Sequence, residues 1–406
     1  MASDSLAVER PQTDFEAARA LFPGAAGTVY MNVAARGLLS RPAREAMDGH
    51  LDRLSAGSAD KPEMFATIER VREKFARLIN AHSDEIAYTK NVSDGLNAIA
   101  SALPWQAGDN MVLCRDLEHP NNIYPWLNQH ARNDVTVRSV PERAGHIDVD
   151  AIIAAIDDRT RLVTASTVTF APGFRADIGR LGRACRERDV FLLVDGVQSV
   201  GVVDTDVQEL QIDGMAVSTQ KCLLGLYGLG FLYCRRDWAA RLTPASLARF
   251  SIDLGEDVHE ATMGDEGYDL MPGARRFDVG NYNYPAAVAV EPSLDLFLEI
   301  GPARIEQYVC GLAQRFAGGL HQLGLPVSGG PPGPHLAHTV TVGSFAANQN
   351  DAMDDAALES LFAHLTDNGV VLSIRRGMLR FALHLYNNEA DVDRVLDLTR
   401  SWLADR

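Results

Sequence analysis

Short apolar segments alternate with helical segments through the middle of the chain, and this alternation constrains the fold more than any other feature. The apolar segments are Ile86–Thr89, Met111–Cys114, Val135–Val137, Leu162–Thr164, Phe191–Val194, Met215–Val217 and Phe231–Tyr233. Strands buried on both faces have this composition, and helices such as Asp177–Arg188 would cover them. The pattern predicts an α/β fold with a mostly parallel sheet and a ligand site at the carboxyl ends of its strands.

The chain length and the order of the segments predict two domains. Residues 28–284 are expected to form a large domain, and residues 285–406 a small C-terminal α+β domain. Residues 1–27 are interpreted as a mobile lead-in that packs with the small domain. Residues 245–276 are polar and contain glycine, which favours an ordered active-site or interface loop over a linker.

Charge and cysteine content narrow the classes of partner. The formal net charge of −16 disfavours nucleic acid or an anionic membrane as the main partner, because both need a concentrated positive surface. The five cysteines are odd in number and widely spaced, which is typical of reduced thiols in a cytosol. The chain has no signal-like start and no apolar stretch of membrane-spanning length. We therefore expect a cytoplasmic protein.

Lys221 and Asp195 follow two neighbouring predicted strands and suggest a cofactor site. A buried lysine can form a Schiff base with an aldehyde cofactor, and a carboxylate at a strand end can keep a pyridine nitrogen protonated. This combination points to pyridoxal 5'-phosphate (PLP). A surface lysine and a loop-capping aspartate are the alternatives, so the hypothesis depends on the neighbouring motifs.

Two serines are candidates for holding the cofactor phosphate. Ser93 lies where a strand leads into a helix, and the N-terminus of a helix suits an anion. Its position predicts a helix N-cap, and an ordinary cap is the alternative to a phosphate site. Ser218 lies just before Lys221 and can donate to the same phosphate.

Three further side chains are placed to surround a cofactor or its substrate. His119 follows the next strand, where an imidazole can stack on a pyridine ring and move protons. Gln198 opens the element after Asp195 and can reach the phenolic oxygen, although a solvent-facing helix residue is the alternative. Arg380 alternates with apolar residues, so its guanidinium either pairs internally or holds a substrate carboxylate.

Seven segments together resemble the class V aminotransferase family of fold type I PLP enzymes, in order and approximate spacing over residues 28–404. They are Thr89–Asn97, Glu118–Trp126, Ser166–Arg175, Val194–Gln198, Ser218–Tyr233, Arg276–Asn281 and Arg380–Asn388. The resemblance implies Lys221 as the Schiff-base lysine, with Asp195, His119 and Gln198 around the pyridine ring. It also implies a phosphate site made by Val92, Ser93 and Ser218.

The resemblance further implies a substrate site and a partner. Arg380 would hold the carboxylate of an amino acid substrate, with Asn32 and Arg375 also in contact with it. Gly280 and Asn281 match the position at which the family's dimers lend phosphate contacts to the partner chain, so a homodimer is expected. A simple turn is the alternative reading of these two residues.

Departures from the family's best-known members bear on the reaction. Cysteine desulfurases carry a catalytic cysteine shortly before the arginine that matches Arg380, whereas the stretch Ser373–Leu379 here contains none. Phe170 replaces an asparagine common in desulfurases, and Gln220 replaces the histidine that commonly precedes the lysine. These features resemble the branch of isopenicillin N epimerase-like and C–S lyase-like enzymes.

The expected reaction is β-elimination at an amino acid or amino-acid conjugate, with Lys221 as the proton carrier. Epimerisation, and decarboxylation or transamination in specialised metabolism, are the alternatives within the family. Arg375 and Arg376 would suit a second acidic group on the substrate if they border the site, or else they are solvated turn residues. A PLP-fold protein that binds a ligand without turning it over is the non-enzyme alternative.

Overall fold

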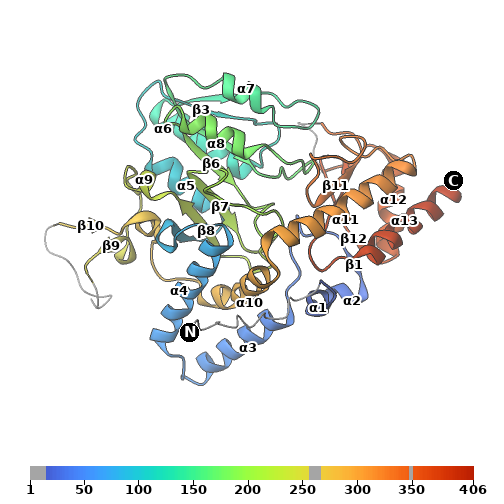
Figure 1. The fold of residues 1–406 in the computed structure, drawn as a ribbon, viewed down its shortest axis with the longest axis horizontal. Helices are drawn as coiled ribbons and strands as arrows, with labels where there is room; N and C mark the ends of the chain where they lie inside the picture. The colour runs from blue at the N-terminus through green and yellow to red at the C-terminus, as the bar shows by residue number, and fades with distance from the viewer. Residues whose placement is uncertain (1–14, 256–266, 347–350) are drawn as a thin grey trace, which may run out of the picture.

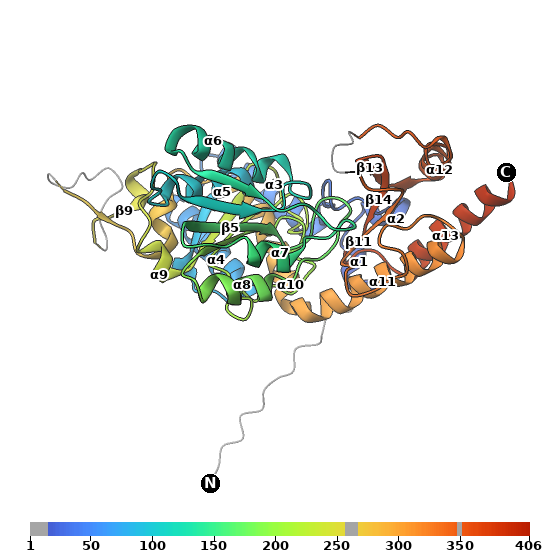
Figure 2. The ribbon, with the colours of Figure 1, turned by 90° about the horizontal axis from the view of Figure 1, so that it is seen from above.

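The computed structural model describes residues 15–255, 267–346 and 351–406. A large α/β domain lies at one end of the molecule and a smaller domain at the other, and α10 (Tyr284–Ile300) and α11 (Pro302–Gln322) run from the first toward the second (Figures 1 and 2). The chain therefore has the α/β architecture that the sequence predicts.

A seven-stranded sheet forms the centre of the large domain, in the order β2-β8-β7-β6-β5-β3-β4. Its strands are β2 (Ile86–Thr89), β3 (Asn110–Leu113), β4 (Thr136–Ser139), β5 (Thr160–Ser166), β6 (Phe191–Asp195), β7 (Gly214–Ser218) and β8 (Gly230–Cys234). Only β8 pairs antiparallel with its neighbours in this sheet, so the prediction of a mostly parallel sheet is confirmed.

Alternate residues of each central strand face two separate apolar cores. In β6, Phe191 and Leu193 belong to one core, and Leu192 and Val194 to the other. The first core includes apolar residues of α5 (Val92–Ala102), α6 (Tyr124–Asn133) and α9 (Arg236–Ala239). The second includes those of α4 (Lys61–Leu78), α7 (Val149–Ala154), α8 (Ile178–Arg186) and α10. The apolar runs are continuous because both faces of the sheet are covered.

The small domain is built on a three-stranded antiparallel sheet in the order β11-β14-β13. Its elements after α11 are β11 (Thr339–Val342), α12 (Ala356–Asp367), β12 (Val370–Val371), β13 (Ser373–Arg375), β14 (Met378–Ala382) and α13 (Glu389–Ala404). Arg380 lies in the central strand β14, where its side chain is buried.

The N-terminal segment packs on the small domain from Phe15 onward. It forms α1 (Phe15–Ala20), α2 (Gly24–Gly27) and β1 (Val29–Tyr30), and β1 pairs in parallel with β12. Arg19 makes an ion pair of 2.6 Å with Asp391, and the Phe15 ring stacks on Tyr308 with centroids 3.8 Å apart. The expectation of a mobile lead-in is therefore wrong for residues 15–27, because these contacts fix them. Residues 1–14 lie outside the described part.

Apart from its first residue, the helix α10 follows the expected boundary at residue 285 in sequence. It nevertheless packs along α3 (Arg41–Ser55) and α4 of the large domain. Lys74 of α4 joins it through ion pairs of 2.9 Å with Glu291 and 2.7 Å with Asp295. The small domain's own helices begin with α11. An amphipathic pattern predicts a helix but does not say which domain its apolar face covers.

Within the segment 245–276, the described residues form short elements close to the large domain. These are two 3₁₀ turns, Arg249–Ser251 and Gly273–Phe277, and an antiparallel pair of β9 (Ile252–Asp253) and β10 (Asp269–Leu270). The predicted ordered loop is thus seen at both of its ends, and residues 256–266 lie outside the described residues. None of the described helices is long and apolar enough to cross a membrane.

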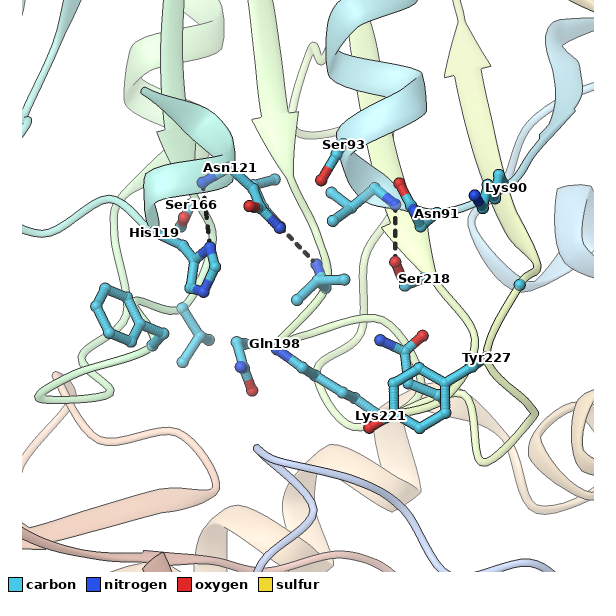
Figure 3. Close-up of a pocket in the computed structure, with 17 residues that line it drawn as sticks. Lys90, Asn91, Ser93, His119, Asn121, Ser166, Gln198, Ser218, Lys221 and Tyr227 are labelled. Carbon is cyan, nitrogen blue, oxygen red and sulfur yellow. Dashed lines mark hydrogen bonds between the residues drawn. The ribbon is translucent and has the colours of Figure 1, made fainter. Parts of the chain in front are cut away.

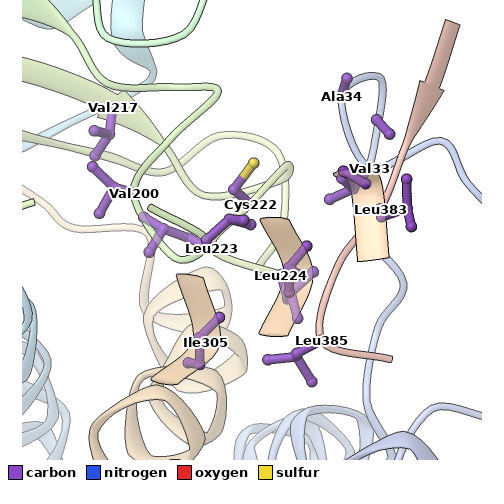
Figure 4. Packing of buried hydrophobic residues seen from close by; sticks show 14 of the residues in the cluster. Val33, Ala34, Val200, Val217, Cys222, Leu223, Leu224, Ile305, Leu383 and Leu385 are labelled. Carbon is purple, nitrogen blue, oxygen red and sulfur yellow. The ribbon is translucent and has the colours of Figure 1, made fainter. Parts of the chain in front are cut away.

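Buried apolar side chains from both domains meet around the turn that carries Lys221. Cys222, Leu223 and Leu224 are all buried there, in one cluster with Val33 and Leu383 (Figure 4). The cluster joins the large domain, the N-terminal segment and the small domain. Packing of this kind fixes the backbone from which the lysine side chain projects.

Candidate active site

A cavity of about 330 Å³ lies at the carboxyl ends of the parallel strands, where the fold class predicts a ligand site. Figure 3 shows Lys221 reaching into it, with His119 and Ser218 on opposite sides of the view. The residues that line it are Lys90, Asn91, Val92, Ser93, His119, Asn121, Ser166, Val168, Phe170, Asp195, Val197, Gln198, Ser218, Gln220, Lys221, Tyr227 and Gly228. The structure thus brings seven predicted cofactor residues into one cavity.

Asp195 is the last residue of β6, and its side chain is buried. One carboxylate oxygen accepts a hydrogen bond of 3.0 Å from the backbone N–H of Val197. Burial raises the pKa of this carboxyl, while that hydrogen bond and the charge of Lys221 act in the opposite direction. A buried carboxylate with few partners favours a cationic or N–H-bearing ligand group beside it.

Lys221 follows β7 by three residues, in a turn whose backbone is held from two sides. The carbonyl before it, of Gln220, accepts from Gly37 N–H at 2.8 Å, and the carbonyl after it, of Cys222, lies 2.9 Å from His384 Nε2. His384 Nδ1 accepts from a backbone N–H at 2.8 Å, so its proton is on Nε2, which donates to Cys222. Burial lowers the pKa of the Lys221 ammonium to about 8, although the Asp195 charge opposes this.

The start of α5 lines another part of the cavity. The prediction that Ser93 is the N-cap of this helix is wrong. The N-cap is Asn91, whose side chain accepts from Asp94 N–H at 3.0 Å, so Ser93 lies inside the first turn. Ser218 Oγ accepts a 2.7 Å hydrogen bond from Val92 N–H, which leaves its own hydroxyl proton for another acceptor. With its side chain freed from capping, Ser93 lines the cavity at a helix N-terminus suited to an anion.

His119 lines the cavity after β3 and is neutral at pH 7. Burial lowers the pKa of its imidazole to about 4, and the charge of Lys221 adds to this effect. Its Nδ1 accepts from Asn121 N–H at 3.2 Å, which places the ring proton on Nε2. The Phe170 ring meets it edge-on, with centroids 5.3 Å apart and an angle of 79° between the rings.

Three buried polar atoms near the cavity have no hydrogen-bond partner among the described residues. They belong to side chains predicted to contact the cofactor or substrate: Gln198 Oε1, Asn32 Oδ1 and Arg380 Nη2. Gln198 Nε2 donates to Ala34 O at 3.0 Å, and Arg380 Nη1 donates to Phe170 O at 2.8 Å. Buried polar groups without partners are rare, so these atoms fit a polar ligand that would satisfy them.

Five predicted residues do not line the cavity in the single chain: Asn32, Gly280, Asn281, Arg375 and Arg380. Arg375 pairs with Asp351 at 3.1 Å, and Arg380 lies behind Phe170. Gly280 has a φ of +100°, a left-handed value that suits glycine. Gly280 and its neighbour Asn281 lie on the segment that follows the 3₁₀ turn Gly273–Phe277.

Glu118 is a site residue that the motif analysis did not assign. It is fully buried and accepts hydrogen bonds of 2.7 Å from both Ser166 N–H and Ser166 Oγ, and one of 2.8 Å from Asn122 Nδ2. Burial raises its pKa to about 7. Because Ser166 lines the cavity, these hydrogen bonds let Glu118 hold the part of the wall that Ser166 forms. The one signal in the sequence was a carboxylate next to His119.

The comparisons with known proteins agree on the family and the fold. A model of the Aminotransferase class-V family matches residues 53–395. A probable cysteine desulfurase from Methanothermobacter thermautotrophicus is 35% identical over 59% of this chain, and the match spans 58% of that relative's length.

Solved structures resemble the whole chain. The alignment with the apo cysteine desulfurase of Thermococcus onnurineus NA1 covers 96% of this chain and 98% of that chain, at 24% identity and a TM-score of 0.82. The alignment with the cystine C-S lyase C-DES, solved with its product cysteine persulfide, covers 93% of this chain and 98% of that chain, at 24% identity and a TM-score of 0.80. A second C-DES structure, with a TM-score of 0.81, carries glycine covalently linked to its PLP cofactor.

Proposed function

The chain belongs to the aminotransferase class-V family of PLP-dependent enzymes, and on that premise we propose that it eliminates a β-substituent from an amino acid or amino-acid conjugate, as a C–S lyase. The observation that carries the proposal is geometric: Lys221, Asp195 and His119 line one cavity, and the Lys221 side chain reaches into it. The pKa of Lys221 lies near 8 and that of His119 near 4. Near neutral pH, Lys221 is therefore the group able both to take and to return a proton.

The residues of the cavity fit PLP. Asp195 would face the pyridine nitrogen, His119 would lie on the ring, and Gln198 would reach the phenolic oxygen. The phosphate would lie at the N-terminus of α5, against Val92, Ser93 and Ser218. When bound, PLP supplies an electron sink that acidifies the Cα–H of an attached amino acid.

Arg380 would hold the substrate's carboxylate, and Asn32 could add a hydrogen bond only through its Nδ2 donor, because its Oδ1 is an acceptor. Arg380 is buried and leaves one guanidinium nitrogen unpaired, and burial lowers its pKa to about 9. A carboxylate would relieve this by pairing with the guanidinium in a charge-assisted hydrogen bond. Asn32 lies beside Ala382 of the same strand through a parallel bridge, so the two side chains approach from neighbouring backbones.

The proposed elimination needs one proton carrier and no oxidant. Lys221 Nζ would take the proton from Cα, and the electron pair of that bond would form a Cα–Cβ double bond. The Cβ–S bond breaks as the sulfur leaves with its electron pair, and the proton on Lys221 Nζ can pass to the leaving thiolate. Water then converts the released enamine to pyruvate and ammonia.

Several features support elimination over persulfide formation on the protein. The stretch Ser373–Leu379 contains no cysteine to receive a sulfur atom. The nearest cysteine in sequence to Lys221, Cys222, is fully buried, and burial raises the pKa of its thiol to about 12. Such a thiol is a poor nucleophile at neutral pH.

A homodimer in the cytoplasm completes the proposal. Gly280 and Asn281 would reach the partner's phosphate site, and the neighbouring Val279 is half exposed in the single chain. None of the five cysteines takes part in a disulfide, which suits a reducing compartment. Sedimentation equilibrium of the loaded protein checks the assembly, and a monomer that binds PLP at full strength would contradict the shared site.

The function is tested by loading the protein with PLP and following its products. The loaded protein should be yellow, and borohydride should bleach it and attach the cofactor to Lys221. S-substituted cysteines should then yield pyruvate, ammonia and a thiol, and Lys221→Ala should yield none. Pyridoxamine phosphate as the sole product would identify a transaminase, and loss of optical activity without pyruvate an epimerase. A colourless protein that takes up no PLP would overturn the enzyme assignment.

A further inference from the structure

Phe170 joins the predicted carboxylate site to the wall of the cavity. Its backbone carbonyl accepts a 2.8 Å hydrogen bond from Arg380 Nη1, and its ring lines the cavity edge-on to His119. An amino acid held through its carboxylate by Arg380 would therefore have the Phe170 ring within reach of its side chain. This ring is the first surface that a β-substituent on that side would meet.

The two arginines at the turn between β13 and β14, Arg375 and Arg376, have other partners. The Arg376 guanidinium carbon lies 4.7 Å from the Phe170 centroid and 5.4 Å from that of Phe345, and its Nη1 donates to Asp116 O. Arg375 is paired with Asp351. Neither arginine lines the cavity, whereas Phe170 does.

The remaining charges of the described cavity are committed or distant. Lys221 and Asp195 would be occupied by the cofactor in the proposed function. Burial lowers the pKa of His119 to about 4, so its imidazole is neutral. Lys90 lines the opposite end, near Asn91 and Tyr227, across the view from His119 (Figure 3). Among the residues that line the cavity, a charged substituent beside Phe170 would thus find no free partner, and the Arg376 guanidinium next to that ring already stacks on it and donates to Asp116 O, whereas an apolar substituent would gain by burial.

We propose that this site selects amino acids whose β-substituent is uncharged and apolar or aromatic, such as S-alkyl or S-aryl cysteines, and that Phe170 determines this specificity. The proposal rests on the proposed function, because it assumes a substrate carboxylate on Arg380. It differs from the alternative in which Arg375 and Arg376 border the site and bind a second acidic group of the substrate.

Amino acids without a β-leaving group test the selection by binding alone. We would titrate the PLP-loaded protein with L-phenylalanine, L-norleucine, L-glutamate, L-lysine and glycine, and follow the absorbance of the bound cofactor. L-phenylalanine and L-norleucine should bind at least tenfold more tightly than L-glutamate and L-lysine. Equal or tighter binding of L-glutamate or L-lysine would overturn the proposal.

Variants locate the effect. Phe170→Ala should weaken binding of L-phenylalanine about tenfold or more and leave glycine within about twofold, and Phe170→Leu should restore binding of L-norleucine. Phe345→Ala is the matched control, because this ring contacts Arg376 without lining the cavity, and it should change neither ligand. An equal loss for glycine and L-phenylalanine in Phe170→Ala and Phe170→Leu would show a structural role and contradict the assignment.

The titration separates the two proposals. If PLP is bound but no amino acid changes its absorbance, the proposed function fails. If all the amino acids change it without preference for apolar side chains, only the specificity fails.

Discussion

Lys221 carries a positive charge in a place that disfavours it. Burial lowers the pKa of its ammonium from 10.5 to about 8, so between these values the unfolded chain binds more protons than the folded one. In the cofactor-free protein, stability should therefore rise with pH across this window, and the penalty is fully present below pH 8. Below pH 8 the buried charge remains, and Lys221 makes an unfavourable contribution to the free energy of folding until a ligand compensates the charge.

The first prediction follows from that sign. In the cofactor-free protein at pH 7, Lys221→Met should raise the free energy of unfolding by on the order of 2 to 3 kcal/mol, because it removes a buried charge. The gain should shrink as the pH approaches 10.5. Urea unfolding at a series of pH values measures both. A gain that does not change with pH would show that packing, not ionisation, is responsible.

A second prediction concerns the carboxylate of the substrate. Arg380→Met should weaken binding of L-amino acids on the order of 100-fold, because the charge-assisted hydrogen bond to the substrate's carboxylate is lost. Cofactor uptake should be unaffected. Arg375→Met is the control: its ion pair with Asp351 is half exposed, so its removal should change affinity by less than about threefold. Equal effects of the two substitutions would remove Arg380 from the site.

At the scale of elements, the strands were predictable because both faces of the sheet are covered, which leaves unbroken apolar runs, whereas the order of the strands in the sheet was not. The exact start of α5 was not, since Asn91 and Ser93 are both good capping residues two positions apart and only the backbone decides between them. Partners distant in sequence were also hidden. The contacts of Arg376 with Asp116 and of Glu118 with Ser166 appear only after folding.

The corrected cap gives a third prediction. Asn91→Ala should lower the stability of the cofactor-free protein by about 1 kcal/mol, because it removes the side chain that caps α5. Ser93→Ala should leave that stability within about 0.5 kcal/mol and instead weaken PLP binding. Denaturant unfolding and cofactor titration on both variants separate the two roles. The reverse assignment would restore Ser93 as the cap.

At the scale of the whole molecule, buried polar contacts hold the large domain's edge to the segment that would reach a partner. Arg72 of α4 is fully buried and pairs with Asp278 at 2.8 Å, two residues before Gly280. Asp278 also accepts from Tyr88 N–H at 2.8 Å. The placement of residues 278–281 thus depends on a charge contributed from far away in the sequence, which no local pattern reveals.

The fourth prediction tests that dependence. Arg72→Met should destabilise the protein by about 3 to 5 kcal/mol, because Asp278 would remain buried without its cation. Adding Asp278→Asn should recover part of the loss, since the uncompensated charge is then gone. Thermal unfolding of the wild type, the two single variants and the double variant completes the comparison. A double variant as unstable as the sum of its single substitutions would show that the two side chains act independently.

The turn around Lys221 is fastened on one side to the N-terminal segment, through Gly37, and on the other to the small domain, through His384. A chromophore attached to Lys221 would therefore register any shift of the small domain, because the shift strains its point of attachment. The absorbance spectrum of the loaded protein would then report on the position of the small domain in solution, without an added label.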